Sequence, residues 1–208
     1  GLISNNPQLM VAKNDLPAGN LAELVTWMKE NPGKINFVNQ NAAANVTGVL
    51  FENLTGQKVQ FIPYRGAGPA MTVLTSGTVD LLVVQGAVAL PQIRAGKIKA
   101  LANLSAARSA SMPDIPTADE TGVPGLYMSG WFGFWAPKGT PKDIIARLNA
   151  ATVEALADPA IQKRFTELGL DVAPRAQQTP EGLAAFQKVE IDKWWPIIKS
   201  AGIGAQAQ

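Results

Sequence analysis

The sequence predicts an α/β fold built around a parallel or mixed sheet. Between residues 9 and 104, short apolar segments alternate with helical segments, and the joins between them are short. This alternation is typical of βαβ units, because parallel neighbouring strands need a crossover between them. The segment 79–84 (VDLLVV) is an unbroken apolar run, which is expected of a strand buried on both faces.

The elements of this part follow one another in a regular order. Residues 1–13 (GLISNNPQLMVAK) have the character of a strand, and the apolar side chains of the next segment recur at helical spacing until Asn31-Pro32-Gly33 ends it. These apolar residues are Leu21, Leu24, Val25 and Met28. Further strands are expected at 35–38, 58–63, 79–84 and 97–105, and further helices at 46–56, 68–77 and 86–96.

The C-terminal part has a different pattern. Residues 105–126 contain three prolines and little periodicity, so they are expected to connect two parts and to carry one short helix near Thr117–Thr121. Residues 127–137 are aromatic and prone to form a strand. Helices at 140–158, 159–169 and 179–202 and a short strand at 170–174 complete the chain, with too few strands for a second sheet of their own.

Composition excludes several classes of function. The 208 residues are 47% hydrophobic and 16% charged, which indicates an ordered globular protein. The chain has no Cys and no His, which excludes Cys/His zinc sites, thiol catalysis and His-based triads. The net charge of +2 and the scattered basic residues argue against a nucleic-acid partner. Since no apolar run approaches about 20 residues, no direct membrane insertion is expected.

Three loops are candidates for a binding site, because each joins a strand to the start of a helix. In open α/β sheets, ligands bind beyond the carboxyl ends of the strands, where helix N-termini offer free N–H groups to an anion. The candidate ligand-binding residues in these loops are Asn39, Gln40, Asn41, Ala42, Asn45, Arg65, Gly66, Ala67, Gly68, Gln85 and Gly86. Trp131 is a further candidate, as an aromatic cover for an organic ligand.

Each candidate also has a purely structural interpretation. The loop 64–70 (YRGAGPA) lacks the third glycine of a dinucleotide fingerprint, since Met71 stands there, and could be an ordinary tight turn. The loop 39–45 (NQNAAAN) could be a turn with a helix cap at Asn45 or Thr47. Arg65 could pair with a carboxylate or project into solvent, and Trp131 could belong to the core.

The loops contain no residue suited to catalysis. Asp, Glu, His, Cys and Lys are all absent from 39–45, 64–70 and 85–89. Neutral donors without a nucleophile or an acid–base pair favour binding without chemistry, so the protein is not expected to be an enzyme. Neither a metal nor a cofactor is expected.

Motifs along nearly the whole chain resemble the tripartite tricarboxylate transporter substrate-binding proteins, the TctC or Bug family. They include YRGAGPAMTVLTSGTVDLLV, ALPQIRAGKIKALA and MPDIPTADETGVPG, followed by WFGFWAPKGTPKDIIARLNAATVEALADPAIQKRFTELGLDV. The resemblance implies a periplasmic binding protein of type II, a Venus flytrap that holds a small carboxylate between two lobes. Residues 10–125 would form the second lobe, and residues 1–9 and 126–208 would form hinge strands and the helical part of the first lobe.

The resemblance also implies partners and a location. The ligand would be a small organic mono- or dicarboxylate, delivered in the periplasm to a permease of two membrane subunits. Relative to the family pattern, the chain lacks roughly a hundred N-terminal residues of the first lobe and any signal peptide. In the loop 39–45 it has Asn45-Val46 where the family usually has His-Leu. Two alternatives remain open: a transferase that binds an anionic substrate at Gly66–Pro69, and a truncated remnant that binds nothing.

Overall fold

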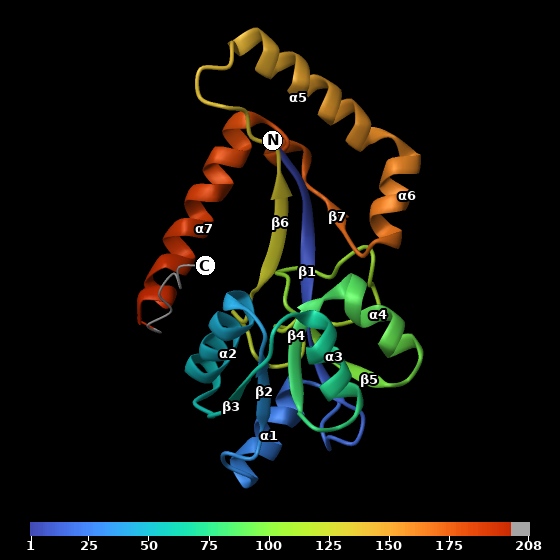
Figure 1. The fold of residues 1–208 in the computed structure, drawn as a ribbon, viewed down its shortest axis with the longest axis vertical. Helices are drawn as coiled ribbons and strands as arrows, with labels where there is room; N and C mark the ends of the chain where they lie inside the picture. Colours follow the sequence, from blue (N-terminus) through green and yellow to red (C-terminus); the bar gives the residue numbers. More distant parts are fainter. Residues whose placement is uncertain (201–208) are drawn as a thin grey trace.

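A computed structural model describes residues 1–200 of the chain. The last two residues of the helix expected at 179–202 lie outside that range. The strand β1 (Leu2–Lys13) runs through most of the length of the molecule and belongs to two groups of strands (Figure 1). Its second half lies in the main sheet, which has the order β3-β2-β4-β1-β5. The other strands of this sheet are β2 (Asn36–Asn39), β3 (Gln60–Pro63), β4 (Leu81–Gln85) and β5 (Ile98–Asn103).

The main sheet is mixed rather than entirely parallel. β2 pairs in parallel with both β3 and β4, as the βαβ pattern predicts. β1 is antiparallel to β4 and β5, so the sheet is mixed, one of the two arrangements expected, whereas the βαβ pattern alone indicated parallel strands. The reason is that β1 enters the sheet from the opposite edge, where Gln8 pairs with Gln85 at the carboxyl end of β4.

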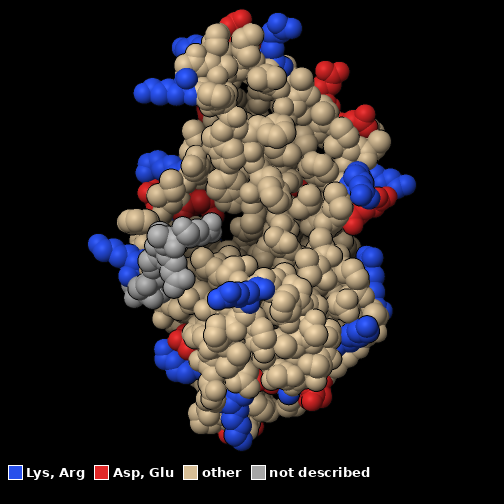
Figure 2. Space-filling model, in the orientation of Figure 1, with Lys and Arg blue, Asp and Glu red and all other residues tan. Residues whose placement is uncertain are grey.

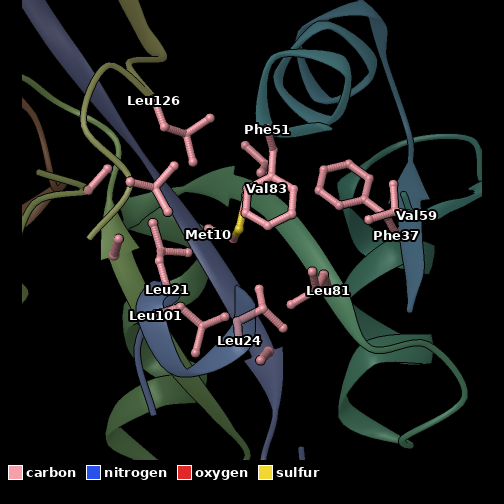
Figure 3. Packing of buried hydrophobic residues seen from close by; sticks show 14 of the residues in the cluster. Met10, Leu21, Leu24, Phe37, Phe51, Val59, Leu81, Val83, Leu101 and Leu126 are labelled. Atoms are coloured by element: carbon pink, nitrogen blue, oxygen red, sulfur yellow. The ribbon is translucent and has the colours of Figure 1, made fainter. Parts of the chain in front are cut away.

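Four helices cover the two faces of the main sheet. α1 (Leu21–Glu30) and α2 (Ala42–Thr55) pack on one face, around a core that includes Met10, Phe37 and Phe51 (Figure 3). α3 (Ala67–Thr75) and α4 (Gly86–Arg94) pack on the other face, against alternate residues of the same strands. Successive buried side chains of β1 and β4 point to opposite faces and so contribute to both cores, as in a strand covered on both faces.

The first half of β1 belongs to a smaller group of strands. It pairs with β6 (Ser129–Gly133) and with β7 (Asp171–Val172), both antiparallel. α5 (Lys142–Ala157), α6 (Pro159–Glu167), a short 3₁₀ helix (Arg175–Gln177) and α7 (Pro180–Ser200) surround these strands (Figure 1). A small core of Leu2, Ala173 and Leu183 lies among them.

Two of the expected helices differ most from the structure. α2 begins at Ala42, four residues earlier than expected, and its N-cap is Asn41 rather than Asn45 or Thr47. The expected helix at Thr117–Thr121 is a single turn, in which the Thr121 N–H donates to the Thr117 carbonyl at 3.1 Å. The Glu120 carboxylate accepts from the Thr117 N–H at 2.7 Å, so a capping box forms although no helix follows.

Candidate functional site

The three candidate loops meet at one edge of the main sheet. β2, β3 and β4 run in parallel, so their carboxyl ends lie together, and the register pairs Asn39 with Pro63. Each strand leads within a few residues into its helix, at Ala42, Ala67 and Gly86. β1 enters the main sheet at the same edge, coming from its pairing with β6 and β7 (Figure 1). We call the segments 39–45, 64–68 and 85–86 the binding edge.

The helix N-termini at the binding edge carry no negative side chain. None of α2, α3 and α4 has an acidic residue in its first turn, whereas α1 and α5 have Glu23 and Asp143 there. Gly66 and Gln85, the caps of α3 and α4, form no side-chain capping bond. Free N–H groups and the positive end of the helix dipole therefore remain available, an arrangement that attracts anions.

The candidate residues of the binding edge differ in exposure. Gln40 and Gly86 are buried, while Asn39, Asn45 and Ala67 are half-buried. Arg65 is exposed, and within residues 1–200 its guanidinium has no ion-pair or hydrogen-bond partner. The remaining candidates are exposed, namely Asn41, Ala42, Gly66, Gly68 and Gln85.

Two of the glycines have identifiable roles. Gly66 has a φ of 89°, a left-handed conformation that favours glycine and turns the chain from β3 into α3. Gly86 is enclosed instead, since a Cβ built on it would lie 2.7 Å from the sulfur of Met112. Gly86 therefore has a packing role, whatever its N–H group does.

Two buried amide oxygens near the binding edge lack a partner. Gln40 donates through Nε2 to the Val83 carbonyl at 2.6 Å, and its Oε1 accepts no hydrogen bond from the described residues. Asn6 of β1, two residues before the pairing of Gln8 with Gln85, also has a buried Oδ1 without a partner in that range. Asn6 was not among the sequence candidates, although the doublet Asn5-Asn6 inside a strand was an available signal.

Trp131 lies in a different environment from the loops. It belongs to β6, where it pairs with Asn5, and its ring is 5.4 Å from that of Phe186 and 5.8 Å from that of Trp135. It packs against the small core around Leu2 and Leu183. Its neighbours thus come from β1, α7 and the segment after β6, and its role as a ligand cover stays a prediction.

A large apolar cavity opens between α5 and α7. Its volume is about 480 Å³, and its walls include Phe134, Trp135, Leu148 and Leu183. Phe134, Trp135 and Leu148 are each more than half exposed. Figure 2 shows one face of the molecule, on which the charged side chains lie mostly around the outline, with a hollow between the upper and lower parts. The exposed apolar side chains that line the cavity between α5 and α7 are typical of surfaces that contact another protein segment or a ligand.

The ionisable groups whose pKa is shifted lie outside the binding edge. Burial lowers the pKa of the Lys193 amine, and Glu190 opposes that shift. A hydrogen bond to Asp80 raises the pKa of Lys13, at the opposite edge of the main sheet. Residues 1–200 contain no cluster of three acidic side chains that could hold a metal. In the same range, no helix combines the length and the apolar character that crossing a membrane requires.

The family model that matches the chain is TctC, described as the tripartite tricarboxylate transporter family receptor, over residues 2–203. Among curated relatives, a protein encoded in the TAR-I ttuE–ttuC′ intergenic region of Agrobacterium vitis is 35% identical over 97% of this chain. BugT of Bordetella pertussis is 33% identical, also over 97%. The chain spans only 59% and 61% of the lengths of these two relatives.

Solved structures agree in fold. The periplasmic binding protein BugD superposes with a TM-score of 0.77 at 36% identity, covering 97% of this chain and 68% of that one. An R. palustris protein solved with adipate gives 0.82 at 27% identity, covering 97% and 67%. MatC from Rhodopseudomonas palustris, solved with bound malate, gives 0.76 at 31% identity, covering 95% and 68%. The match over nearly the whole chain, and the likeness of the fold, lead to one conclusion: the chain belongs to the TctC family of tripartite tricarboxylate transporter receptors.

Proposed function

We propose that the protein is a periplasmic receptor that captures a small organic carboxylate and delivers it to the permease subunits of a tripartite transporter. The observation that carries this proposal is the binding edge. There, three helix N-termini without acidic residues in their first turns lie together at the end of the main sheet where β1 enters it. Membership of a receptor family supports binding without catalysis. Relatives solved with adipate and malate support a carboxylate as the ligand class.

The physical case for a carboxylate depends on charge and donors. Each of the three N-termini contributes a partial positive charge and free N–H donors, and Arg65 adds a full charge with no partner within residues 1–200. Side-chain amides at Asn39, Asn41 and Asn45 can donate to or accept from the rest of the ligand. A cationic or purely apolar ligand would leave these donors without partners, at a cost for each.

We propose that the binding edge is one half of a two-lobed clamp. Residues 10–125 would form one lobe, and residues 1–9 and 126–208 the hinge and part of the other. β1 supports this division, because its two halves pair with different strands and pass from one group to the other without a break. The apolar cavity between α5 and α7 would be covered by further first-lobe structure, of the kind found in relatives that are longer than this chain.

Ligand-induced stabilisation tests the proposal. Melting temperatures would be measured for the 208-residue chain, and for the longest form of the protein that contains it, with malate, adipate, glucose and choline. We expect a carboxylate to raise the melting temperature, because a ligand at about 100 times its Kd stabilises the folded state by about 2.7 kcal/mol. Stabilisation by glucose or choline, with none by either carboxylate, would overturn the proposal.

The transferase alternative receives no support from the binding edge. Within 39–45, 64–68 and 85–86 no carboxylate, thiol or amine lies ready to act as a nucleophile or base, and Arg65 is the sole charged side chain.

A further inference from the structure

The turn between α6 and β7 lies directly against the first turn of α4. Gly169, in this turn, is buried and has a φ of 69°. A Cβ built on Gly169 would lie 2.9 Å from the backbone nitrogen of Ala87 and 3.2 Å from its Cα. This is an approach of backbone to backbone, which neither partner can relieve by changing a rotamer, so only glycine fits at position 169.

Two residues further on, Asp171 makes a second connection. Its Oδ1 accepts a hydrogen bond from the Ser109 hydroxyl at 2.9 Å, and the Ser111 backbone nitrogen lies 3.4 Å from the same oxygen. The hydroxyl oxygens of Ser109 and Ser111 are 2.7 Å apart. Ser109 is only 2% exposed, and loss of the Asp171 acceptor would leave its hydroxyl with Ser111 as its one remaining partner among the described residues.

The segment that Asp171 holds also reaches the start of α4. Met112 is 3% exposed, and its sulfur would lie 2.7 Å from a Cβ built on Gly86. The first turn of α4 is thus held from two sides, by the Met112 side chain and by the Gly169 backbone. Both sides depend on β7, because Gly169 leads into it and Asp171, which lies in it, binds the 109–111 segment.

We propose that Gly169 and Asp171 are positioning residues that place the α4 part of the binding edge from the other side of the hinge. The first turn of α4, from Gly86 onward, then takes its position relative to α2 and α3 when the α6–β7 turn is docked, while Gln85 is held by its pairing with Gln8 in the main sheet. The charge effect of a helix N-terminus falls off within its first turn, so a small displacement of α4 removes its share of anion binding. The ligand part of this inference depends on the proposed function, but the positioning part does not.

Hydrogen exchange of Gly169→Ala tests the positioning. Gly33→Ala is the matched control, since Gly33 has a φ of 71° and nothing within 4 Å of its added Cβ. We expect Gly169→Ala to speed exchange about tenfold in residues 86–94 and 109–115, with α3 unchanged as an internal reference. Gly33→Ala should leave all three segments unchanged. Faster exchange confined to residues 159–172, or equal effects of the two substitutions, would overturn the inference.

A second set of variants covers the case in which Gly169→Ala does not fold. Asp171→Ala and Ser109→Ala should each speed exchange at the start of α4, and the double substitution should add little to either alone. Additive effects of the two substitutions would contradict a direct coupling.

Malate and adipate serve as probes for the ligand part. If either stabilises the unmodified chain, Gly169→Ala should lose most of that stabilisation and Gly33→Ala should keep it. If Gly169→Ala kept the full stabilisation by the ligand while hydrogen exchange in α4 was faster, the docked α6–β7 turn would not be needed for ligand binding, and this part of the inference would be overturned. If neither probe stabilises the unmodified chain, the proposed function fails for these ligands, while the exchange experiment still decides the positioning.

Discussion

The Gln40 side chain joins two parts of the binding edge: its Nε2 donates to the Val83 carbonyl at 2.6 Å. Gln40 follows β2 and Val83 lies in β4, so the bond holds the loop before α2 against the neighbouring strand. The bond also fixes the amide so that its oxygen is buried without a partner among residues 1–200. A donor from an ordered water or from a ligand would satisfy that oxygen, since buried polar atoms in folded proteins rarely stay unpaired.

The cap of α2 provides a first prediction. The Asn41 Oδ1 accepts from the Ala44 N–H at 2.9 Å, so Asn41→Ala should lower the free energy of unfolding by about 0.5–2 kcal/mol. Asn45 lies inside the helix, and Asn45→Ala should be neutral or slightly stabilising, because alanine has the higher helix propensity. Urea unfolding of both variants checks this. A larger loss of unfolding free energy for Asn45→Ala than for Asn41→Ala would instead indicate that Asn45 is the N-cap, as the sequence suggested.

The cap of α2 shows which features of the fold can be predicted from the sequence and which cannot. The spacing of Leu21, Leu24 and Met28 predicts α1 because all three side chains pack on one face of the main sheet. The start of α2 is ambiguous, because Asn41, Asn45 and Thr47 are all acceptable caps and the alanines between them suit either a helix or a loop. The choice depends on where β2 ends in three dimensions.

The direction of β1 and the contact between the α6–β7 turn and α4 were harder to predict. β1 is antiparallel because it enters the main sheet from the opposite edge, and no local pattern in its residues records that. The three loops of the binding edge could be predicted together, since parallel strands bring their carboxyl ends to one edge. The approach of Gly169 to Ala87 joins residues far apart in the chain, and only the tertiary structure shows it.

A charge placed at the binding edge should separate stability from binding. Ala42 is exposed in the first turn of α2, so Ala42→Asp should leave stability unchanged or raise it by about 0.3–1 kcal/mol through the helix dipole. The same carboxylate should weaken binding of malate or adipate, because it repels an anion at this site. Ligand-induced melting shifts measure the second effect, and urea unfolding measures the first.

The matched control for Ala42→Asp is Ala160→Asp. Ala160 is also exposed and lies in the first turn of α6, outside the binding edge. Carboxylate binding should be unaffected by Ala160→Asp. Equal losses of binding in the two variants would mean that the anion does not bind near α2.

Packing under α2 leads to a third prediction. A Cβ on Gly48 would lie 2.4 Å from Cε1 of Phe61, whose ring meets that of Phe37 edge to face at 5.6 Å. Gly48→Ala should therefore destabilise the protein, since overpacking costs about 1–3 kcal/mol and exceeds the helix gain of about 0.5–1 kcal/mol. Gly68→Ala is the control for space, because nothing apart from its chain neighbours lies within 4 Å of its Cβ in α3. Pro69 disfavours the helical conformation for a preceding residue with a Cβ, so no net gain is expected, but the loss should be smaller than that of Gly48→Ala. Thermal unfolding compares the two losses.

A pH-dependent contribution to stability is expected from Lys13. Its amine lies 3.0 Å from Asp80, which is 7% exposed and also accepts from the Asn36 N–H at 2.7 Å. Lys13→Met would leave the Asp80 carboxylate with fewer partners, so it should lower the free energy of unfolding by about 1–3 kcal/mol at pH 7. Lys97→Met, at an exposed position, is the control and should have little effect.

The sign of the pH dependence follows from the raised pKa of Lys13, caused mainly by its hydrogen bond to Asp80. Above pH 10.5, the ordinary pKa of a lysine amine, the folded state binds more protons at Lys13 than the unfolded state does. The contribution is therefore fully present below pH 10.5 and is lost as the pH rises through the folded pKa. Urea unfolding from pH 7 to 11.5 should show the gap between the unmodified chain and Lys13→Met narrowing only at the alkaline end. A gap that narrows toward neutral pH would instead assign the effect to another group.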